Sequence, residues 1–190
     1  INKKGQGIFS SKIIEKYSTI PIEDEGRLKN YNIRDEFLTK IFTINNLKCE
    51  NSILDFHNKN SLLLKSYDEE IYNDLNNIII KENMDEDDKT LYKNKVYEIL
   101  NNKRDKSKRL NLIKNIFEKY KTYLSKNEIN YFSNLLKLYE NGKIPFSSVI
   151  VAIQIYATRF DDKDLLNQTF FNPYPIELIS IADSGKGRNL

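Results

Sequence analysis

Apolar residues recur at helical spacing along most of this chain, and this period constrains the fold more than any other feature. Between residues 33 and 44 the apolar positions are spaced by four, four and three, at Ile33, Phe37, Ile41 and Ile44. Such steps place side chains on one face of an α-helix. Six further segments are expected to be helical: 50–66, 66–79, 85–100, 106–124, 125–141 and 145–156. The sequence therefore predicts an all-α bundle of six to eight helices.

Capping and stop signals mark several of these helix ends. The spacing Ser66-x-x-Glu69 predicts a capping box at the start of the third helix, and Ser125-x-x-Glu128 predicts another at the sixth. Gly142 follows the sixth helix as a C′ residue, and Pro145 suits the first turn of the next. That next helix is apolar on every side between residues 149 and 156, so we expect it at the centre of the bundle.

The first 30 residues follow a different pattern. Apolar residues between Ile8 and Tyr17 predict a short helix. Pro21 disfavours helix for the residue before it, so residues 19–22 are expected to be extended. An acidic turn at 23–26 follows. A helix, a strand and a turn in this order predict a short α/β remnant at the N-terminus, in front of the bundle.

The chain contains one cysteine and one histidine, and these counts exclude several kinds of site. A single Cys excludes an internal disulfide, a cysteine-based zinc site and an iron–sulfur cluster held by this chain alone. Cys49 is interpreted as an incidental thiol. The acidic residues 85–88 lack the spacing of a calcium loop and suit a helix N-terminus. We expect no metal and no cofactor in this chain.

The longest stretch without a charge spans residues 144–158. Its 15 residues include Pro145 and several polar side chains, whereas a membrane-spanning helix takes about 20 apolar residues. The first residues also lack the apolar run of a signal peptide. We therefore expect a soluble, cytoplasmic protein with no membrane partner.

His57 is the only imidazole in the chain. In a helix over 50–66 it lies on the apolar side, because Ile53 and Leu54 precede it by four and three residues. Asn60 and Ser61 follow at three and four residues and form a polar notch suited to a base edge or a small ligand. The alternative is a core histidine that is hydrogen-bonded to its neighbours. The sequence leaves both interpretations open.

Residues 103–143 are the most basic part of the chain, with 11 basic and 4 acidic side chains. A helix over 106–124 carries an apolar stripe and, opposite to it, a row of guanidinium, ammonium and amide groups. Such groups suit RNA phosphates, sugars and base edges; the alternative is a solvated helix face. The candidate nucleic-acid contacts are Arg104, Lys108, Asn111, Lys114, Asn115, Lys119, Lys121 and His57.

Several motifs follow one another in an order shared with a known family. Phe56 opens the motif F-H-x-x-N-x-L-L-L, Tyr139-x-x-Gly142-x-x-Pro145 follows in the middle, and Asn-Pro-Tyr-Pro ends at Pro175. Together they resemble the YbgA-like helical domain, a family of unknown function. The motif residues are Phe56, Tyr139, Gly142, Pro145, Arg159, Gln168, Pro173, Tyr174 and Pro175.

The N-terminal part resembles a second family. Gly5-x-Gly7-Ile8-Phe9 and the run from Pro21 to Leu28 are similar to the last stretch of a TudS-like thiouracil desulfidase domain. The two resemblances imply a TudS-like tail over 1–48, a YbgA-like helical domain over 49–182 and a flexible tail over 183–190.

Two-domain proteins of this type are desulfidases that remove sulfur from thiolated uracil, including 4-thiouridine in tRNA. The resemblance implies a [4Fe–4S] cluster on cysteines of the N-terminal domain, which we expect to lie before Ile1. It also implies that the helical domain engages RNA. Where many relatives carry histidines, this chain has Asn60, Tyr67 and Asn115.

The expected function is therefore that of a tRNA-binding helical domain. Its partners would be tRNA or other structured RNA, and a TudS-like catalytic domain in cis or in trans. The alternative is a protein-interaction or dimerisation module in which the apolar helix over 145–156 forms an interface. A third hypothesis, an enzyme that uses His57 with a nearby acid, has no nucleophile, metal or phosphate motif to support it.

Overall fold

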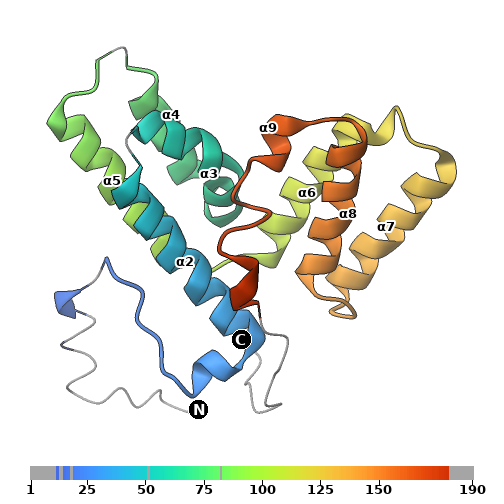
Figure 1. Cartoon of the computed structure of the whole chain (residues 1–190), viewed down its shortest axis with the longest axis horizontal. Coiled ribbons are helices and arrows are strands. Elements are labelled where there is room, and N and C mark those ends of the chain that lie inside the picture. Colours follow the sequence, from blue (N-terminus) through green and yellow to red (C-terminus); the bar gives the residue numbers. More distant parts are fainter. Residues whose placement is uncertain (1–11, 13–14, 18, 51, 82, 180–190) are drawn as a thin grey trace. The chain divides into compact units, whose positions relative to one another are not determined.

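The computed structural model describes residues 12, 15–17, 19–50, 52–81 and 83–179. These residues form α-helices and short 3-10 turns, with no strand among them, so the predicted all-α class is confirmed (Figure 1). The elements are η1 (Arg27–Lys29), α2 (Tyr31–Cys49), α3 (Ile53–Tyr67), α4 (Glu69–Ile79), α5 (Glu86–Asn101), α6 (Lys106–Lys121), α7 (Lys126–Glu140), α8 (Phe146–Arg159), α9 (Lys163–Leu166) and η2 (Ile176–Leu178).

The chain divides into two compact units. One consists of residues 49–173 and holds α3 to α9; the other consists of the residues before Cys49 together with those from Tyr174 onward. In the second unit, the Tyr174 hydroxyl donates to the Asp35 carboxylate at 2.5 Å, and its ring lies 6.3 Å from that of Phe42. These contacts tie the tyrosine of the Asn-Pro-Tyr-Pro motif to α2.

Two groups of helices build the unit over 49–173. Helices α3, α4 and α5 pack against one another, as do α6, α7 and α8, while α3 contacts α6 and α9 contacts α8 (Figure 1). Apolar side chains at helical spacing fill both groups, because burying them is the main gain in free energy on folding. The residues without any exposed surface are Leu64, Leu75, Tyr92, Val96, Ile99, Ile113, Val149, Ile153 and Ala157.

The N-cap of helix α4 lies two residues later than predicted. Asp68 is the N-cap, and its carboxylate accepts from the backbone nitrogens of Glu70 and Ile71, both at 3.1 Å. Ser66 instead lies inside α3, where its hydroxyl donates to the Leu63 carbonyl at 2.6 Å. The predicted capping box at Ser66 is therefore wrong. A buried Ser66 continues α3, whereas the extended backbone of Asp68 breaks it.

Two other helix-end predictions are confirmed. Ser125 and Glu128 form a reciprocal capping box at the start of α7, at 3.3 Å for the Glu128 backbone and 2.8 Å for the Ser125 backbone. Gly142 follows α7 with φ at +68°, the left-handed conformation that favours glycine.

Helix α8 differs from its predicted position in the bundle. Val149 and Ile153 are fully buried, but Val151 and Ile155 on the other side are 53% and 61% exposed. The helix is therefore packed on one face, not at the centre, because among the described helices only α6, α7 and α9 contact it. Pro145 precedes the helix as its N-cap and does not occupy the first turn.

The predicted α/β remnant is not found in the part of the chain that the structure describes. Residues 19–22 form no strand, and the backbone nitrogen of Ile20 donates to the Tyr17 carbonyl at 3.0 Å, which turns the chain. A lone extended segment would need a partner strand for its N–H and C=O groups. Most of the predicted helix over 8–17, the Gly5-x-Gly7 motif and the predicted tail over 183–190 lie outside the described residues.

Candidate nucleic-acid interface

Helix α6 carries most of the predicted contact residues. It begins after Asp105, whose carboxylate accepts from the backbone nitrogens of Ser107 and Lys108 at 2.6 and 3.0 Å. Its apolar stripe is buried as predicted, with Ile113 and Tyr120 at 0% and 4% exposure. The polar row on the other side is consequently left facing outward.

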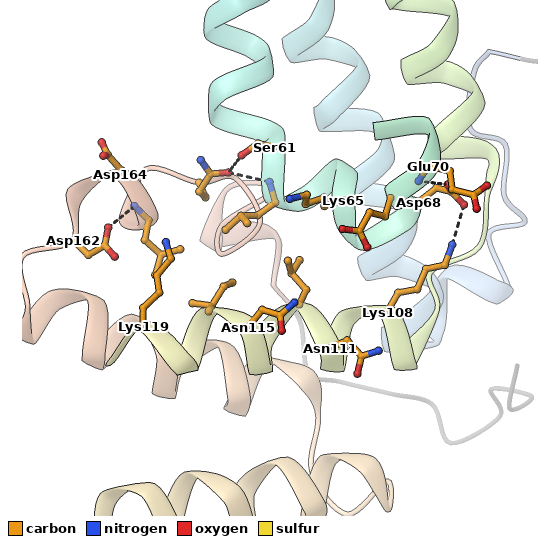
Figure 2. A pocket seen from close by; sticks show the side chains of 16 residues that line it. Ser61, Lys65, Asp68, Glu70, Lys108, Asn111, Asn115, Lys119, Asp162 and Asp164 are labelled. Carbon is orange, nitrogen blue, oxygen red and sulfur yellow. Dashed lines mark hydrogen bonds and ion pairs between the residues drawn. The ribbon is translucent and has the colours of Figure 1, made fainter. Parts of the chain in front are cut away.

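A groove of about 820 Å³ runs along this polar row, and Figure 2 shows its residues from close by. Helix α6 forms one wall, the C-terminal half of α3 with the start of α4 forms the other, and residues 162–168 close one end. The lining residues are Ser61, Leu62, Lys65, Asp68, Glu69, Glu70, Lys108, Asn111, Leu112, Asn115, Ile116, Lys119, Asp162, Asp164, Leu165 and Gln168.

Two of the predicted cations are held by the other wall. The Lys108 ammonium donates to the Asp68 carboxylate at 2.9 Å and to the Tyr67 carbonyl at 3.2 Å (Figure 2). The hydrogen bond from Lys108 is the largest of the effects that lower the pKa of Asp68. Arg104 donates through Nε to the Tyr67 hydroxyl at 3.0 Å, and its guanidinium lies 5.7 Å from the centre of that ring.

Other predicted contacts keep their polar atoms available. Asn111 and Asn115 are exposed in the groove wall, and neither side chain has a hydrogen-bond partner within the described residues. The ammonium groups of Lys114 and Lys119 likewise have no ion-pair partner within the described residues. Lys121 pairs with Glu118 on the same helix at 2.9 Å. Lys114 and Lys121 do not line the groove.

Gln168 fixes one end of the groove to α3. Its side-chain oxygen accepts from the Ser61 hydroxyl at 3.0 Å and from the Leu62 backbone nitrogen at 3.1 Å, while its side-chain nitrogen donates to the Asn58 carbonyl at 2.7 Å. The next residue, Thr169, donates its backbone N–H to the Lys59 carbonyl at 2.9 Å. The polar notch predicted beside His57 is thus partly filled by Gln168.

Asp162 lies in the same closing segment and joins it to α6. It caps α9 by accepting from the Leu165 backbone nitrogen at 3.1 Å, and it accepts from the Tyr120 hydroxyl at 2.7 Å. Burial and this hydrogen bond raise the pKa of Tyr120. Figure 2 shows Lys119 extending from α6 toward the segment that carries Asp162 and Asp164.

The groove carries a net negative charge, which the sequence did not predict. Three lysines and five carboxylates line it, which gives a net charge of −2. All five carboxylates lie outside the basic block over 103–143, at residues 68–70, 162 and 164. Asp68 and Asp162 each precede a helix, so N-cap preference was the signal that could have found them.

His57 lies in the core and not among the residues that line the groove. Its Nε2 lies 2.8 Å from the Asn76 side-chain oxygen and its Nδ1 lies 3.0 Å from the Tyr92 hydroxyl. An amide oxygen only accepts, so Nε2 carries the proton and Nδ1 accepts from Tyr92. Its ring stacks on Tyr72 at 5.3 Å. Burial lowers its pKa, partly opposed by the bond to Asn76. This geometry agrees with the core-histidine interpretation.

The family-motif residues outside the groove make packing contacts. Phe56 is 1% exposed, and the Tyr139 hydroxyl accepts from the Arg109 guanidinium at 3.0 Å. Arg159 forms an ion pair with Glu128, which joins α8 to α7, and its guanidinium lies 5.2 Å from the Phe160 ring. Pro173 is half-buried at the end of the unit, and Pro175 caps η2.

No cluster of three or more His, Cys, Asp and Glu side chains among the described residues is arranged to hold a metal ion. A [4Fe–4S] cluster takes several cysteine thiolates, and the chain has only Cys49, which is exposed, so its residues do not fit that group. No helix in the described part is both long and apolar enough to cross a membrane.

Comparison with known proteins identifies the helical unit. No curated protein and no solved structure matches the chain. A family model described as "Protein of unknown function (DUF1722)" matches residues 61–175, which include all of the groove residues. The matched range covers more than half of the 190 residues. The chain therefore belongs to the DUF1722 family, the YbgA-like helical domains.

Proposed function

We propose that this chain is the RNA-docking part of a tRNA thiouridine desulfidase, and that it presents thiolated uridine to an iron–sulfur catalytic domain outside these residues. The observation that carries the proposal is the outward face of α6. Asn111, Asn115 and Lys119 line a groove there without intramolecular partners among the described residues, and Lys114 is equally available beside it. Free ammonium and amide groups are the usual contacts to RNA phosphates and bases.

Not all of the predicted cations are available for phosphate contacts in this proposal. Lys114 and Lys119 have no partner in the described part, and Lys121 has only an exposed pair with Glu118, which solvent and salt weaken. We assign the phosphate contacts to Lys114 and Lys121, which do not line the groove, whereas Lys119 lines it. Lys108 and Arg104 are already bound to the α3–α4 junction, and His57 is 4% exposed. These three residues therefore serve the fold in this proposal.

The desulfidase part of the proposal rests on the N-terminal resemblance. The family match begins at residue 61 and leaves the segment over 1–48 outside it. In this proposal that segment belongs to a TudS-like domain, whose own cysteines carry the cluster. The catalytic domain acts in cis or in trans, and the helical unit supplies RNA affinity.

A filter-binding titration of the full chain against tRNA at two salt concentrations tests the RNA-docking proposal. Each phosphate contact adds roughly 0.7 to 0.9 to the slope of log K against log salt. The double variant Lys114→Ala with Lys121→Ala is expected to flatten that slope by about 1.5. Lys137→Ala, an exposed lysine on α7, is the matched control. Absence of tRNA binding at low salt, or an unchanged slope in the double variant, contradicts the proposal.

The exposed face of α8 favours a second candidate function, self-association. Val151 and Ile155 lie one turn apart and are 53% and 61% exposed, and Leu138 on α7 is 44% exposed. Exposed apolar side chains that are neighbours on one helix face are typical of protein interfaces. Size-exclusion chromatography with light scattering tests it: a dimer that Val151→Asp with Ile155→Asp converts to a monomer supports this candidate. A wild-type monomer at all concentrations removes it.

A further inference from the structure

The charges in the groove indicate which part of an RNA it accepts. Three lysines and five carboxylates line it, and Lys108 is already paired with Asp68. A phosphodiester inside this groove would lie close to Glu69, Glu70 and Asp164, and like charges at short range repel. The phosphates of a bound RNA are therefore expected outside the groove, where Lys114 and Lys121 lie.

The neutral residues of the groove suit an uncharged ring. Asn111 and Asn115 lie four residues apart on α6, so their side chains are neighbours on one face. Each amide offers both donors and an acceptor, which is what the edge of a nucleobase requires. Leu62, Leu112 and Ile116 add apolar surface from both walls. The volume of about 820 Å³ falls within the usual range for small-ligand sites.

We propose that this groove binds the base of one unpaired nucleotide, with Asn111 and Asn115 hydrogen-bonded to its edge. This inference rests on the proposed RNA-docking function and specifies its target. A paired base has its Watson–Crick edge occupied, whereas unpaired bases in loops and bulges can enter a protein site. Both ends of the site are linked before binding: Gln168 fixes one end to α3, and the Lys108–Asp68 pair bridges the walls at the other (Figure 2). A preformed site loses less conformational entropy when it binds.

The test compares two single-stranded probes of equal length and charge, an oligouridylate and the corresponding abasic oligomer. Wild-type full-length chain is expected to bind the oligouridylate on the order of tenfold more tightly, as two added hydrogen bonds would give. Asn111→Ala with Asn115→Ala is expected to remove that difference and to leave the salt slope unchanged. Asn134→Ala, an exposed asparagine on α7, is the matched control.

The outcomes separate this inference from the proposed function. Equal, salt-dependent binding of the two oligomers overturns the base site and leaves RNA docking intact. A wild-type preference that persists in the double variant also overturns the assignment to Asn111 and Asn115. Titration with the nucleoside uridine, followed by NMR of the side-chain amides, gives a readout that does not need phosphate contacts. If tRNA binding fails and uridine shifts neither side-chain amide signal, both proposals are wrong. If tRNA binding fails but uridine shifts the amide signals, the base site is still supported.

Discussion

The side-chain oxygen of Gln168 lies 3.1 Å from the backbone nitrogen of Leu62, within the span of helix α3. The nitrogen of the same amide lies 2.7 Å from the carbonyl of Asn58. Asn58 and Leu62 are four residues apart, the spacing at which an α-helix bonds its own backbone groups. One side chain thus bridges a helical carbonyl and amide, and attaches the segment after α9 to the far wall of the groove.

Replacing this glutamine is expected to destabilise the helical unit. Gln168→Ala removes hydrogen bonds to Ser61, Leu62 and Asn58 at once, and at about 1 kcal/mol for each bond the expected cost is about 1–3 kcal/mol. Urea unfolding of the wild type and the variant measures the difference in free energy of unfolding. The neighbouring exposed Asn167→Ala is the control. If the two variants unfold at the same urea concentration, Gln168 does not stabilise the groove.

The burial of His57 predicts that the free energy of unfolding depends on pH. Burial holds its pKa in the folded chain below the ordinary value of 6.5, so the unfolded chain binds its proton first as pH falls. The stabilisation is therefore complete above pH 6.5 and is lost progressively as pH falls toward the lowered folded-state pKa. The free-energy difference between wild type and His57→Gln should shrink over that interval. Because the chain has one histidine, a difference that does not change with pH contradicts the prediction.

Substitutions of Asp68, the N-cap of α4, separate the stability that its cap contributes from that of its ion pair with Lys108. Asp68→Ala removes both the cap and the partner of Lys108, and is expected to cost about 1 kcal/mol of the free energy of unfolding. Asp68→Asn keeps a capping oxygen and loses only a partly exposed ion pair, so its cost should be about 0.5 kcal/mol or less. Thermal unfolding compares the two. Ser66→Ala leaves the Asp68 cap intact and should be nearly neutral.

Gly142 provides a test of backbone conformation without a packing change. A Cβ atom at this position would meet no atom within 4 Å, so any cost of Gly142→Ala comes from its φ of +68°. The left-handed conformation costs an alanine roughly 1 kcal/mol relative to glycine. Gly142→Asn should cost less, since asparagine tolerates this region. Equal stability of the wild type and the alanine variant, measured by urea unfolding, would contradict this account.

Much of the fold was predictable because its signals are local. The capping box at Ser125 and the stop at Gly142 depend on residues within four positions, and both occur as predicted. The apolar stripe of α6 was also predictable, since spacing alone decides which side chains share a helical face. The failures at Ser66 and at α8 have another cause: whether Ser66 ends a helix, or Val151 is covered, depends on the neighbouring elements.

The sequence by itself determined the all-α class, the ends of several helices and the polar row on α6, because hydrophobic period and capping act over one or two turns. Only the tertiary structure decided what that row faces. Gln168 meets Leu62 across 106 residues, and the carboxylates at 68–70 and 162–164 come to one groove from separate elements. Tyr92 reaches His57 across 35 residues and places it in the core. Such pairings follow from packing, which gathers distant side chains and so sets the charge and the polar partners of a site.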